Sequence, residues 1–448
     1  MYYANNNQEK KWFMSIQNVT LEDIVTDRNL IEAYKQVRQN KGSAGVDGMD
    51  IVQAHDYIME NLENIRRSVL DGRYKPRPVR RVYIPKDNGK MRQLGIPTVV
   101  DRVIQQAIKQ ALWYTFEKKF SDSSYGYRPF KGALDAIKKA NEHINNGRIY
   151  IVEMDLEKFF NTVNHDKLCQ LLSSQICDTR IISLISKFLN SGAMDKGVFE
   201  DTEIGVPQGG PLSPLLANIY LDVLDKELEK RGHIFVRYAD DLNIFCKSKA
   251  SAKQTLKHLI PFIEGKLKLK VNREKTKVSR PSRIKFLGYT FGKNSKDVGY
   301  TPRLHSKSKE KIKEKIKEVT QRSTLMEKEQ WIAKANQVVR GWGNYFYLAE
   351  MKNFLTNLDS WFRRRIRMVF LKRWKKPKTK IRNLIKLGLD ENGAKCVGYS
   401  RKGYWRVAQN PLISIAMPNT KLEKNGFLFF LPLYEEKVKQ EMEKVVNI

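Results

Sequence analysis

Three aspartates, Asp155, Asp240 and Asp241, have the types and spacing best suited to chemistry in this chain of 448 residues. Asp240 and Asp241 stand between two apolar, β-prone runs, which predicts a tight β-hairpin with acids at its tip. Asp155 ends another strand-like run, 150–154. If these strands are neighbours, the carboxylates converge and repel one another unless cations lie among them. Two Mg²⁺ ions roughly 3.5–4 Å apart serve nucleotide transfer in polymerases, whereas an Asp-Asp pair alone is also a common turn cap.

The charge balance favours a nucleic-acid partner. Lys and Arg number 82 against 49 acids, a formal net charge of +33, which points to nucleic acid or an anionic membrane surface. No apolar run approaches the roughly 20 residues that span a bilayer, and the first residues lack the apolar core of a secretory signal. The four cysteines form no C-x-x-C pair, so we expect neither a zinc ribbon nor a disulfide framework. This usage fits a reducing cytosol.

Hydrophobic periodicity and turn signals predict an α+β fold, with helices behind an antiparallel sheet. Asp87-Asn88-Gly89-Lys90 predicts a hairpin turn that makes a basic two-stranded finger. Thr20 is the expected cap of the first helix, with Asp23 three residues later. The expected strands cover 78–86, 91–96, 150–155, 234–236, 242–246 and 286–291. The expected helices cover 19–40, 50–70, 100–120, 131–146, 166–190, the segment from loop 205–214 to about 230, 250–265, 307–319, 331–339 and 353–370.

A basic stretch near the C-terminus predicts a surface for phosphates. Between Arg363 and Arg382, 11 of 20 residues are Lys or Arg and none is acidic, and aromatic residues interleave with them. This composition suits phosphate contacts combined with stacking. For any single residue, a solvated helix face is the alternative interpretation. Pro377 interrupts the helical pattern, which predicts a boundary near residue 375.

Eight sequence blocks, in this order, resemble the group II intron-encoded reverse transcriptases, or maturases, of the compact bacterial, group IIC-like type without an endonuclease domain. The blocks are Gly45-Val46-Asp47-Gly48; Ile84-Pro85-Lys86 with Arg92-Gln93-Leu94-Gly95-Ile96-Pro97; Ser124-Tyr125-Gly126-Tyr127-Arg128-Pro129; Met154-Asp155-Leu156-Glu157-Lys158-Phe159-Phe160; Pro207-Gln208-Gly209-Gly210-Pro211-Leu212-Ser213-Pro214; Tyr238-Ala239-Asp240-Asp241; Lys270-Val271-Asn272-Arg273-Glu274-Lys275; and Phe286-Leu287-Gly288-Tyr289.

The resemblance implies a right-hand polymerase of four domains. These are an N-terminal extension (1–75), reverse transcriptase fingers and palm (76–295), an α-helical thumb or X (maturase) domain (296–375), and a small basic DNA-binding C-terminal domain (376–448). No C-x-x-C pair or His-rich nuclease cluster follows residue 376, so we expect no H-N-H endonuclease. The family also implies a bacterial protein of the cytoplasm, associated with the nucleoid.

The resemblance assigns the catalytic metal site. Asp155 and Asp240 match the ligands of two Mg²⁺ ions, for which Mn²⁺ can substitute, and Asp241 matches the third catalytic acid and ligand. The backbone carbonyl of Leu156 matches a further ligand.

Other matched positions bind the incoming dNTP. Lys86 and Arg92 match residues that grip the triphosphate, with a solvated basic edge strand as the alternative. Phe160 matches a gate that excludes the ribose 2′-hydroxyl, with a core aromatic as the alternative. Gln208 matches the residue beneath the templating base, and Lys275 a lysine near the triphosphate.

Nucleic-acid contacts are expected at two further groups of residues. Near the active site they are Arg128, Gly209, Gly210 and Tyr238, with the glycines permitting close backbone approach. In the C-terminal basic stretch they are Arg363, Arg364, Arg365, Arg367, Lys372 and Arg373.

The function these expectations describe is an RNA-directed DNA polymerase that binds group II intron RNA, assists its splicing and copies it into DNA during retrohoming. Its partners would be the intron RNA, an RNA template with a DNA or RNA primer, target DNA and dNTPs, with no membrane; the oligomeric state is left open. One alternative is a polymerase-inactive RNA-binding splicing cofactor, against which the intact acids argue. Others are a reverse transcriptase domesticated for host DNA repair or phage defence, and an RNA-dependent RNA polymerase, which Phe160 fits poorly.

Overall fold

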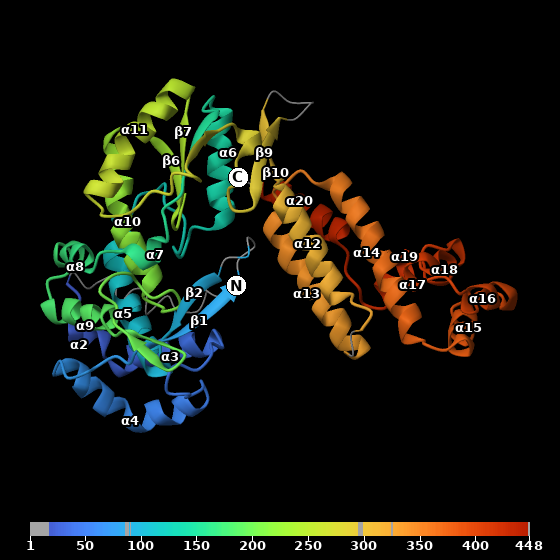
Figure 1. Ribbon diagram of the computed structural model, residues 1–448, viewed down its shortest axis with the longest axis horizontal. Helices are drawn as coiled ribbons and strands as arrows, with labels where there is room; N and C mark the ends of the chain where they lie inside the picture. The colour runs from blue at the N-terminus through green and yellow to red at the C-terminus, as the bar shows by residue number, and fades with distance from the viewer. Residues whose placement is uncertain (1–17, 86–88, 90, 294–298, 324–325, 447–448) are drawn as a thin grey trace. The chain divides into compact units, whose positions relative to one another are not determined.

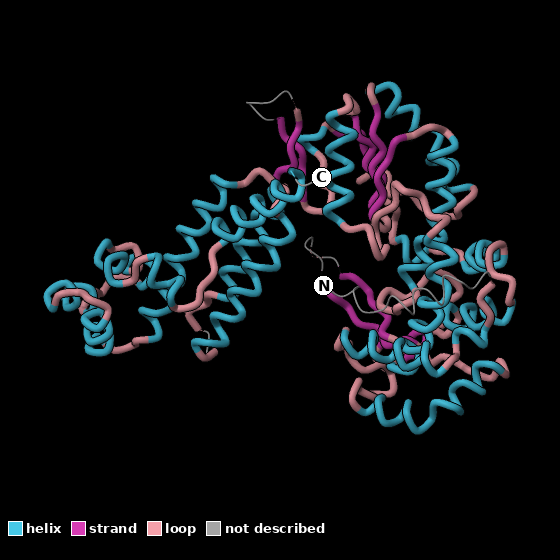
Figure 2. Tube along the Cα trace, turned by 180° about the vertical axis from the view of Figure 1, so that it is seen from behind, coloured by secondary structure: helices cyan, strands magenta, loops and turns pink. Residues whose placement is uncertain are grey.

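The computed structural model describes residues 18–85, 89, 91–293, 299–323 and 326–446, and the chain divides into two compact units, 1–280 and 281–448. Helices and mostly antiparallel strands make up both units, which confirms the predicted α+β class (Figures 1 and 2). The four-domain division is finer than these units and stays a prediction. Lys86 lies outside the described residues, as does most of the predicted hairpin turn.

The first unit holds two four-stranded sheets and the helices around them (Figure 1). Its helices are α2 (Leu21–Ile24), α3 (Asp27–Gln39), α4 (Gln53–Leu70), α5 (Val99–Glu117), α6 (Ala133–Asn145), α7 (Phe159–Thr162), α8 (His165–Ser173), α9 (Thr179–Leu189), α10 (Ser213–Lys230) and α11 (Lys249–Gly265). Its strands are β1 (Val79–Pro85), β2 (Met91–Ile96), β3 (Tyr150–Met154), β4 (Ala193–Asp195), β5 (Val198–Glu200), β6 (Ile234–Tyr238), β7 (Asp241–Cys246) and β8 (Lys277–Ser279).

The sheet that carries the three acids has the strand order β6-β7-β3-β8, with every neighbouring pair antiparallel. Side chains alternate between the two faces along each strand. On one face, Leu242, Ile244 and Val152 are fully buried in the main core, where α10 and α11 pack. The opposite face carries Asp241 and, two residues further on, Asn243. The back of the sheet is therefore packed, and the front presents the acids at one end. Away from the acids the front is packed too, since Ile151, Val236 and Phe245 on this face are buried.

The second sheet has the order β2-β1-β4-β5 and contains the predicted basic finger. β1 and β2 pair antiparallel with Ile84 opposite Arg92, as the hairpin signal predicted. β1 also pairs with β4 in parallel, and neither β4 nor β5 was predicted, because their three-residue strands are too short for a period-2 pattern.

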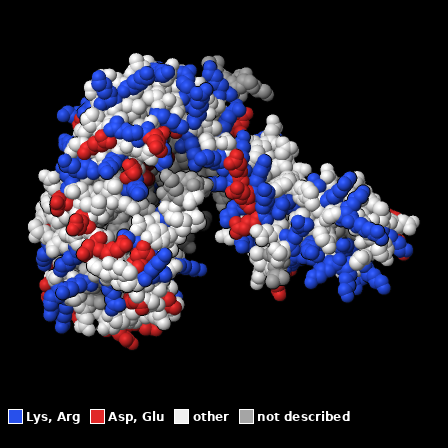
Figure 3. Space-filling view, viewed as in Figure 1, with Lys and Arg blue, Asp and Glu red and all other residues white. Residues whose placement is uncertain are grey.

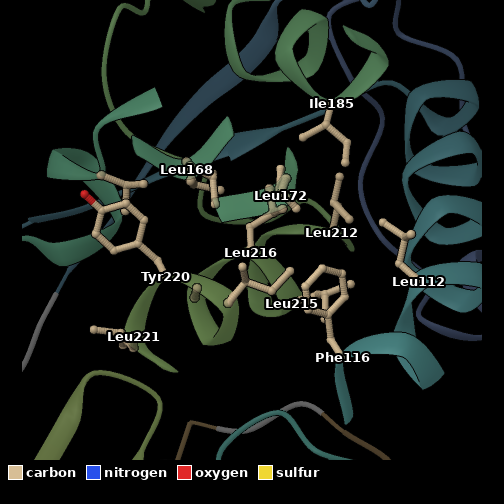
Figure 4. Close-up of a cluster of buried hydrophobic side chains, with 14 of the residues drawn as sticks. Leu112, Phe116, Leu168, Leu172, Ile185, Leu212, Leu215, Leu216, Tyr220 and Leu221 are labelled. Carbon is tan, nitrogen blue, oxygen red and sulfur yellow. The ribbon is translucent and has the colours of Figure 1, made fainter. Parts of the chain in front are cut away.

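Apolar helix faces pack with the back of the acid-bearing sheet in one core, part of which is shown in Figure 4. Leu215, Leu216 and Tyr220 on α10 are almost fully buried, and so are Leu112 on α5 and Leu172 on α8. Burying each such side chain stabilises the fold by about 1.5–3 kcal/mol. This core gives the acid-bearing sheet a rigid support.

The N-terminal prediction was partly wrong. Thr20 caps as expected, in a capping box with Asp23, but the segment 19–40 forms two helices rather than one. The side chain of Thr26 accepts a hydrogen bond from Asn29 N (3.4 Å) and starts the second helix. A Thr side chain that bonds the backbone competes with helix continuation.

The second unit begins with the hairpin β9 (Tyr289–Lys293) and β10 (Tyr300–Leu304), preceded by the turn η1 (Pro281–Arg283). β10 was not predicted, and the strand expected from residue 286 begins at Tyr289. Three long helices follow as predicted, and six more complete the unit. They are α12 (Ser306–Val319), α13 (Lys328–Phe346), α14 (Lys352–Arg373), α15 (Pro377–Lys386), α16 (Glu391–Gly398), α17 (Tyr404–Val407), α18 (Pro411–Ala416), α19 (Asn419–Lys424) and α20 (Phe430–Val446).

Buried aromatic residues hold the second unit together. The fully buried Trp331 donates from Nε1 to the Val319 carbonyl (2.8 Å), and its ring meets Phe427 edge-on at 5.0 Å. Asp359 on α14 accepts from the backbone nitrogens of Phe430 (3.0 Å) and Leu431 (2.8 Å) at the start of α20. These contacts fasten the C-terminal helix to the helices of the same unit.

Candidate active site

The β6–β7 hairpin presents two acids at its tip. Tyr238 pairs with Asp241 in register, so Ala239 and Asp240 form a two-residue loop. Ala239 has φ +57°, in the left-handed region that an alanine rarely adopts. Non-glycine residues held there cluster at functional sites. The predicted hairpin is thus confirmed, and its tip is a strained loop.

Strand register brings Asp155 to the same place. β3 pairs with β7 so that Met154 lies opposite Leu242, which places Asp155 beside Asp241 at the end of the sheet. Asn272 N donates to the Asp155 carbonyl (2.9 Å), and Asp155 N donates to Thr276 Oγ1 (3.2 Å), which orients the residue. The predicted convergence of acids distant in sequence is confirmed.

Electrostatics identify these acids as a strained group of like charges. Burial, together with the nearby charges of Asp240, Glu153 and Asp155, raises the pKa of Asp241 to about 7. Surrounding protein also raises the pKa of Asp240, with Asp155 contributing, although the side chain of Asp240 reaches solvent. Such carboxylates are stabilised by a nearby cation.

Lys275 supplies part of that compensation. Its Nζ lies 3.2 Å from Oδ2 and 3.5 Å from Oδ1 of Asp155, and both side chains are substantially exposed. Glu153, two residues before Asp155 on the same strand face, has Lys277 Nζ 3.8 Å from its Oε1. Lysine side chains therefore border the acids on the β8 side of the sheet.

The donor set fits a divalent cation of the magnesium type. Carboxylate oxygens are the ligands Mg²⁺ prefers, and Mg²⁺ usually binds through one or two carboxylates, with water and substrate phosphates completing its shell. Within the described residues, no three His, Cys, Asp or Glu side chains already form a metal cage. Leu156, the predicted backbone ligand, is buried and bridges to Val271.

Arg92 and Phe160 were both predicted to bind the dNTP, and that role stays a prediction. Arg92 is exposed on β2, and its charge lowers the pKa of Asp240 against the other influences. Phe160 is half-buried and meets the fully buried Phe159 edge-on at 5.2 Å. One side of the Phe160 ring is therefore supported by the core.

The loop after residue 205 packs against the finger hairpin. Gln208 accepts at its carbonyl from Gly95 N (2.9 Å). A Cβ at Gly209, which has φ +135°, would fall 2.6 Å from the Gly95 carbonyl, and a Cβ at Gly210 would strike Gln105. Contacts within the protein are therefore sufficient to explain why glycine occupies both positions. Gly209 is exposed and Gly210 is buried, and their contact with nucleic acid stays a prediction.

The side chain of Arg128 makes its hydrogen bonds within the protein. Its buried guanidinium donates to Glu117 (Nη2 to Oε1, 2.7 Å) and to the carbonyls of Ser121 (2.5 Å) and Ser124 (2.9 Å). Another side chain of the same block, Tyr127, lies close enough to Asp240 for that carboxylate to affect it. It is exposed, has φ +60°, and has its pKa raised by surrounding protein and by Asp240.

Sequence reasoning did not single out Tyr127, Glu153 or the buried pair of Arg237 and Asp225. Glu153 was visible two residues before Asp155, a spacing that puts both on one strand face. The sequence could not predict the role of Arg237, because a single arginine in a strand does not reveal its partner. The side chain of Tyr238 lies on the acid-bearing face.

In the second unit, the arginines of α14 pack within the protein. Arg364 lies over the Trp405 ring at 3.7 Å and donates to the Trp405 carbonyl; Arg367 is buried and donates to the Met417 carbonyl (3.0 Å). The remaining predicted residues make similar contacts: Arg363 lies over Phe429 (4.8 Å), Arg365 donates to Thr320 (2.5 Å), Arg373 donates to Met326 O (2.8 Å), and the exposed Lys372 lies over Tyr404 (5.4 Å).

Exposed cations gather further along the chain. Lys378, Arg382 and Lys386 on α15, with Lys395 on α16, surround the exposed side chains of Ile385 and Tyr399. Figure 3 shows Lys and Arg side chains over these two helices. No helix in the described part of the chain is long and apolar enough to cross a membrane.

Comparison with known proteins identifies two domains in the chain. Residues 84–291 match the reverse transcriptase (RNA-dependent DNA polymerase) family, and residues 309–388 match the group II intron maturase-specific domain.

Three curated relatives illustrate the range of the similarity. Protein YkfC of Escherichia coli K12 is 33% identical over 290 residues, 56% of this chain and 76% of the relative. Group II intron-encoded protein LtrA of Lactococcus lactis subsp. cremoris is 33% identical over 323 residues, and the matched region spans 57% of this chain and 54% of LtrA. The retron Ec86 reverse transcriptase of Escherichia coli is 30% identical over 178 residues, 38% of this chain and half of that protein. The chain belongs to the family of group II intron-encoded reverse transcriptases and maturases.

Proposed function

We propose that this protein extends a primer 3′-hydroxyl with dNTPs on an RNA template, using Asp155, Asp240 and Asp241 as its catalytic acids. The single observation that carries the proposal is the register of β6, β7 and β3, which gathers the three carboxylates at one end of a sheet. The raised pKa values of Asp240 and Asp241 indicate a place that requires a cation.

Asp155, Asp240 and Asp241, with the Leu156 carbonyl, would hold Mg²⁺, or Mn²⁺ in its place. When bound, two such ions favour deprotonation of the primer hydroxyl and neutralise charge on the leaving pyrophosphate. The contribution of the protein is to hold the carboxylates in place. The strained loop at Ala239 and the backbone bonds of Asp155 do this.

Residues around the acids would select and orient the dNTP. Arg92 and Lys275, with Lys86, would bind the triphosphate, since guanidinium and ammonium groups on rigid elements suit phosphate oxygens. Phe160, supported by Phe159, would exclude the 2′-hydroxyl of an rNTP. Gln208 would lie beneath the templating base.

Template and primer would be held by the surrounding surface. Tyr238 lies on the face of the sheet that carries the acids, and Gly209 is exposed in the loop beside β2, while Gly210 and Arg128 would act from beneath this surface. The formal net charge of +33 supports binding to phosphates throughout.

The maturase-specific domain supports a second activity on RNA. We propose that the protein binds group II intron RNA, assists its splicing and copies it into target DNA in retrohoming, in the bacterial cytoplasm near the nucleoid. LtrA is described as a group II intron-encoded protein, which supports this assignment. Lys372 and the arginines of α14 would contribute to that surface, and the segment from 376 onward would contact DNA.

Primer extension on an RNA template tests the polymerase. The wild type should incorporate dNTPs, and Asp240→Asn should lose at least about 100-fold in rate, because a carboxylate aimed at the reacting centre is removed. Thermal unfolding of both proteins checks that the fold is retained. Equal extension by both, or none by either, would reject the site; an inactive wild type that still promotes splicing would favour the splicing-cofactor alternative.

A further inference from the structure

Arg237 lies directly before the acid-bearing hairpin and points away from the acids. It pairs in register with Leu242, so its side chain extends from the back of the sheet into the core. There it forms a fork with Asp225 on α10: Nε lies 2.8 Å from Oδ1, and Nη2 lies 2.5 Å from Oδ2. Both side chains are almost fully buried. A fully desolvated ion pair is retained only when its geometry and further hydrogen bonds compensate its desolvation.

Those further hydrogen bonds lead to the hairpin tip. Arg237 Nη1 donates to the carbonyl of Ala239 (3.0 Å) and to Asn218 Oδ1 (3.1 Å). Asn218, also fully buried on α10, donates from Nδ2 to the Gly126 carbonyl (2.9 Å). The guanidinium is thus the junction of helix α10, the loop that carries Asp240, and segment 123–126.

Segment 123–126 holds the same loop from its other side. Arg237 N donates to the Ser123 carbonyl and Tyr125 N donates to the Arg237 carbonyl, both at 2.8 Å. A Cβ on Gly126 would fall under 3.0 Å from the backbone nitrogen of Ala239, so the segment and the loop are in direct contact. Ala239 therefore keeps its left-handed conformation between two fixed neighbours.

We propose that Arg237 is a positioning residue of the active site: through Asp225 and Asn218 it fixes the Ala239 carbonyl and so sets where Asp240 and Asp241 point. This inference rests on the proposed function, because those acids are its catalytic groups. The Ala239 carbonyl directly precedes Asp240, so its position affects the catalytic carboxylates. Small misplacements of reacting groups cost about 100-fold in rate.

A purely structural role for the pair is the competing explanation. Removing Arg237 alone would leave Asp225 as an uncompensated buried charge and could unfold the unit. The informative variant replaces both partners by apolar residues of similar size, Arg237→Met with Asp225→Leu. Such replacements of buried pairs are often tolerated by the fold, yet they leave the Ala239 carbonyl without its donor.

The experiment compares this double variant with the wild type and with Arg231→Met/Glu227→Leu, a control that removes a more exposed ion pair from the end of the same helix. We expect the double variant to unfold at the wild-type temperature, to lose about 10- to 100-fold in kcat for primer extension with little change in KM for dNTP, and to need more Mg²⁺. Binding of Mn²⁺ to the protein alone, followed by electron paramagnetic resonance, should weaken about tenfold. The control should match the wild type.

Each outcome decides the question. A folded double variant with wild-type kcat and Mn²⁺ binding overturns the proposal. If the double variant does not fold, Arg237→Lys decides. Lysine keeps the charge beside Asp225 but has one nitrogen in place of the fork whose separate nitrogens bind Asp225 and the Ala239 carbonyl. Wild-type behaviour of this variant, or its failure to fold, assigns the pair to stability alone. A wild type without polymerase activity rejects the proposed function, and Mn²⁺ binding then still tests Arg237.

Discussion

The ammonium nitrogen of Lys275, just before β8, lies 3.2 Å from Oδ2 of Asp155. Lys275 is 62% exposed and Asp155 39%, so the pair contributes little to folding free energy. The effect of the pair is electrostatic, because the positive charge of Lys275 partly compensates the negative charge of Asp155, which lies beside two other carboxylates. A phosphate-binding residue and a metal-binding residue of the proposed reaction are thus in contact.

Replacing Lys275 distinguishes a role in binding the triphosphate from a role in orienting Asp155. We expect Lys275→Ala to raise KM for dNTP about tenfold, the size of one lost charge-assisted contact, with an unchanged unfolding temperature. Steady-state primer extension measures KM, and Lys253→Ala, an exposed lysine on α11, is the control. A lower kcat with unchanged KM would show instead that Lys275 serves to orient Asp155.

Gly126 should tolerate no side chain. In Gly126→Ala the new Cβ would strike the Ala239 backbone, so the hairpin tip must move. We expect a loss of about 1–3 kcal/mol in unfolding free energy and at least about 100-fold in extension rate. Gly265→Ala, where a Cβ meets nothing within 4 Å, should leave both unchanged. Wild-type activity of Gly126→Ala would show that the acids do not depend on this contact.

Phe160 is predicted to set sugar selectivity. Phe160→Ala removes the ring that rests on Phe159, so the preference for dNTP over rNTP should fall about 10- to 100-fold while DNA synthesis continues. Competing single-nucleotide incorporation of dNTP and rNTP gives the ratio. An unchanged ratio with reduced stability would place Phe160 in the core instead.

Asp222 should make stability depend on pH. Burial, with help from Asp225, raises its pKa to about 6 from a usual 3.8. Between these values the folded protein binds a proton that the unfolded chain has released, so stability falls as pH rises from about 4 to 6. Asp222→Asn should remove this loss, a relative gain of about 2–3 kcal/mol above pH 6. Urea unfolding at pH 4.5 and pH 7 measures it; parallel curves for both proteins would contradict the shift.

The basic residues of α14 should divide into two classes. Arg367→Ala breaks buried bonds to the Met417 carbonyl and Asn419 Oδ1, so it should cost about 1.5–3 kcal/mol of unfolding free energy. Lys372 is exposed, so Lys372→Ala should spare stability, weaken RNA binding and lower its salt dependence by about one phosphate contact. Salt-dependent RNA binding and thermal unfolding of both variants separate the classes. Equal effects of the two variants on stability would contradict the division.

Local signals in the sequence were sufficient to predict the strands and the hairpin that carry the acids. Apolar, β-prone runs on either side of Asp240 and Asp241 predicted the hairpin, and the capping box of Thr20 and Asp23 predicted a helix start. These features depend on neighbours within a few residues. The eight ordered blocks extended this local information to the family, which the matched domains confirm.

Only the tertiary structure decided which charged side chains face solvent and which are internal supports. Arg128 and Arg367 have the same composition signal as an exposed arginine, yet each is buried against carbonyls that a linear pattern cannot reveal. Arg237 is the clearest case, because its partners come from a helix and a loop tip at once. The physical reason is that desolvation and hydrogen bonding depend on distances between segments, and these exist only after the chain has packed.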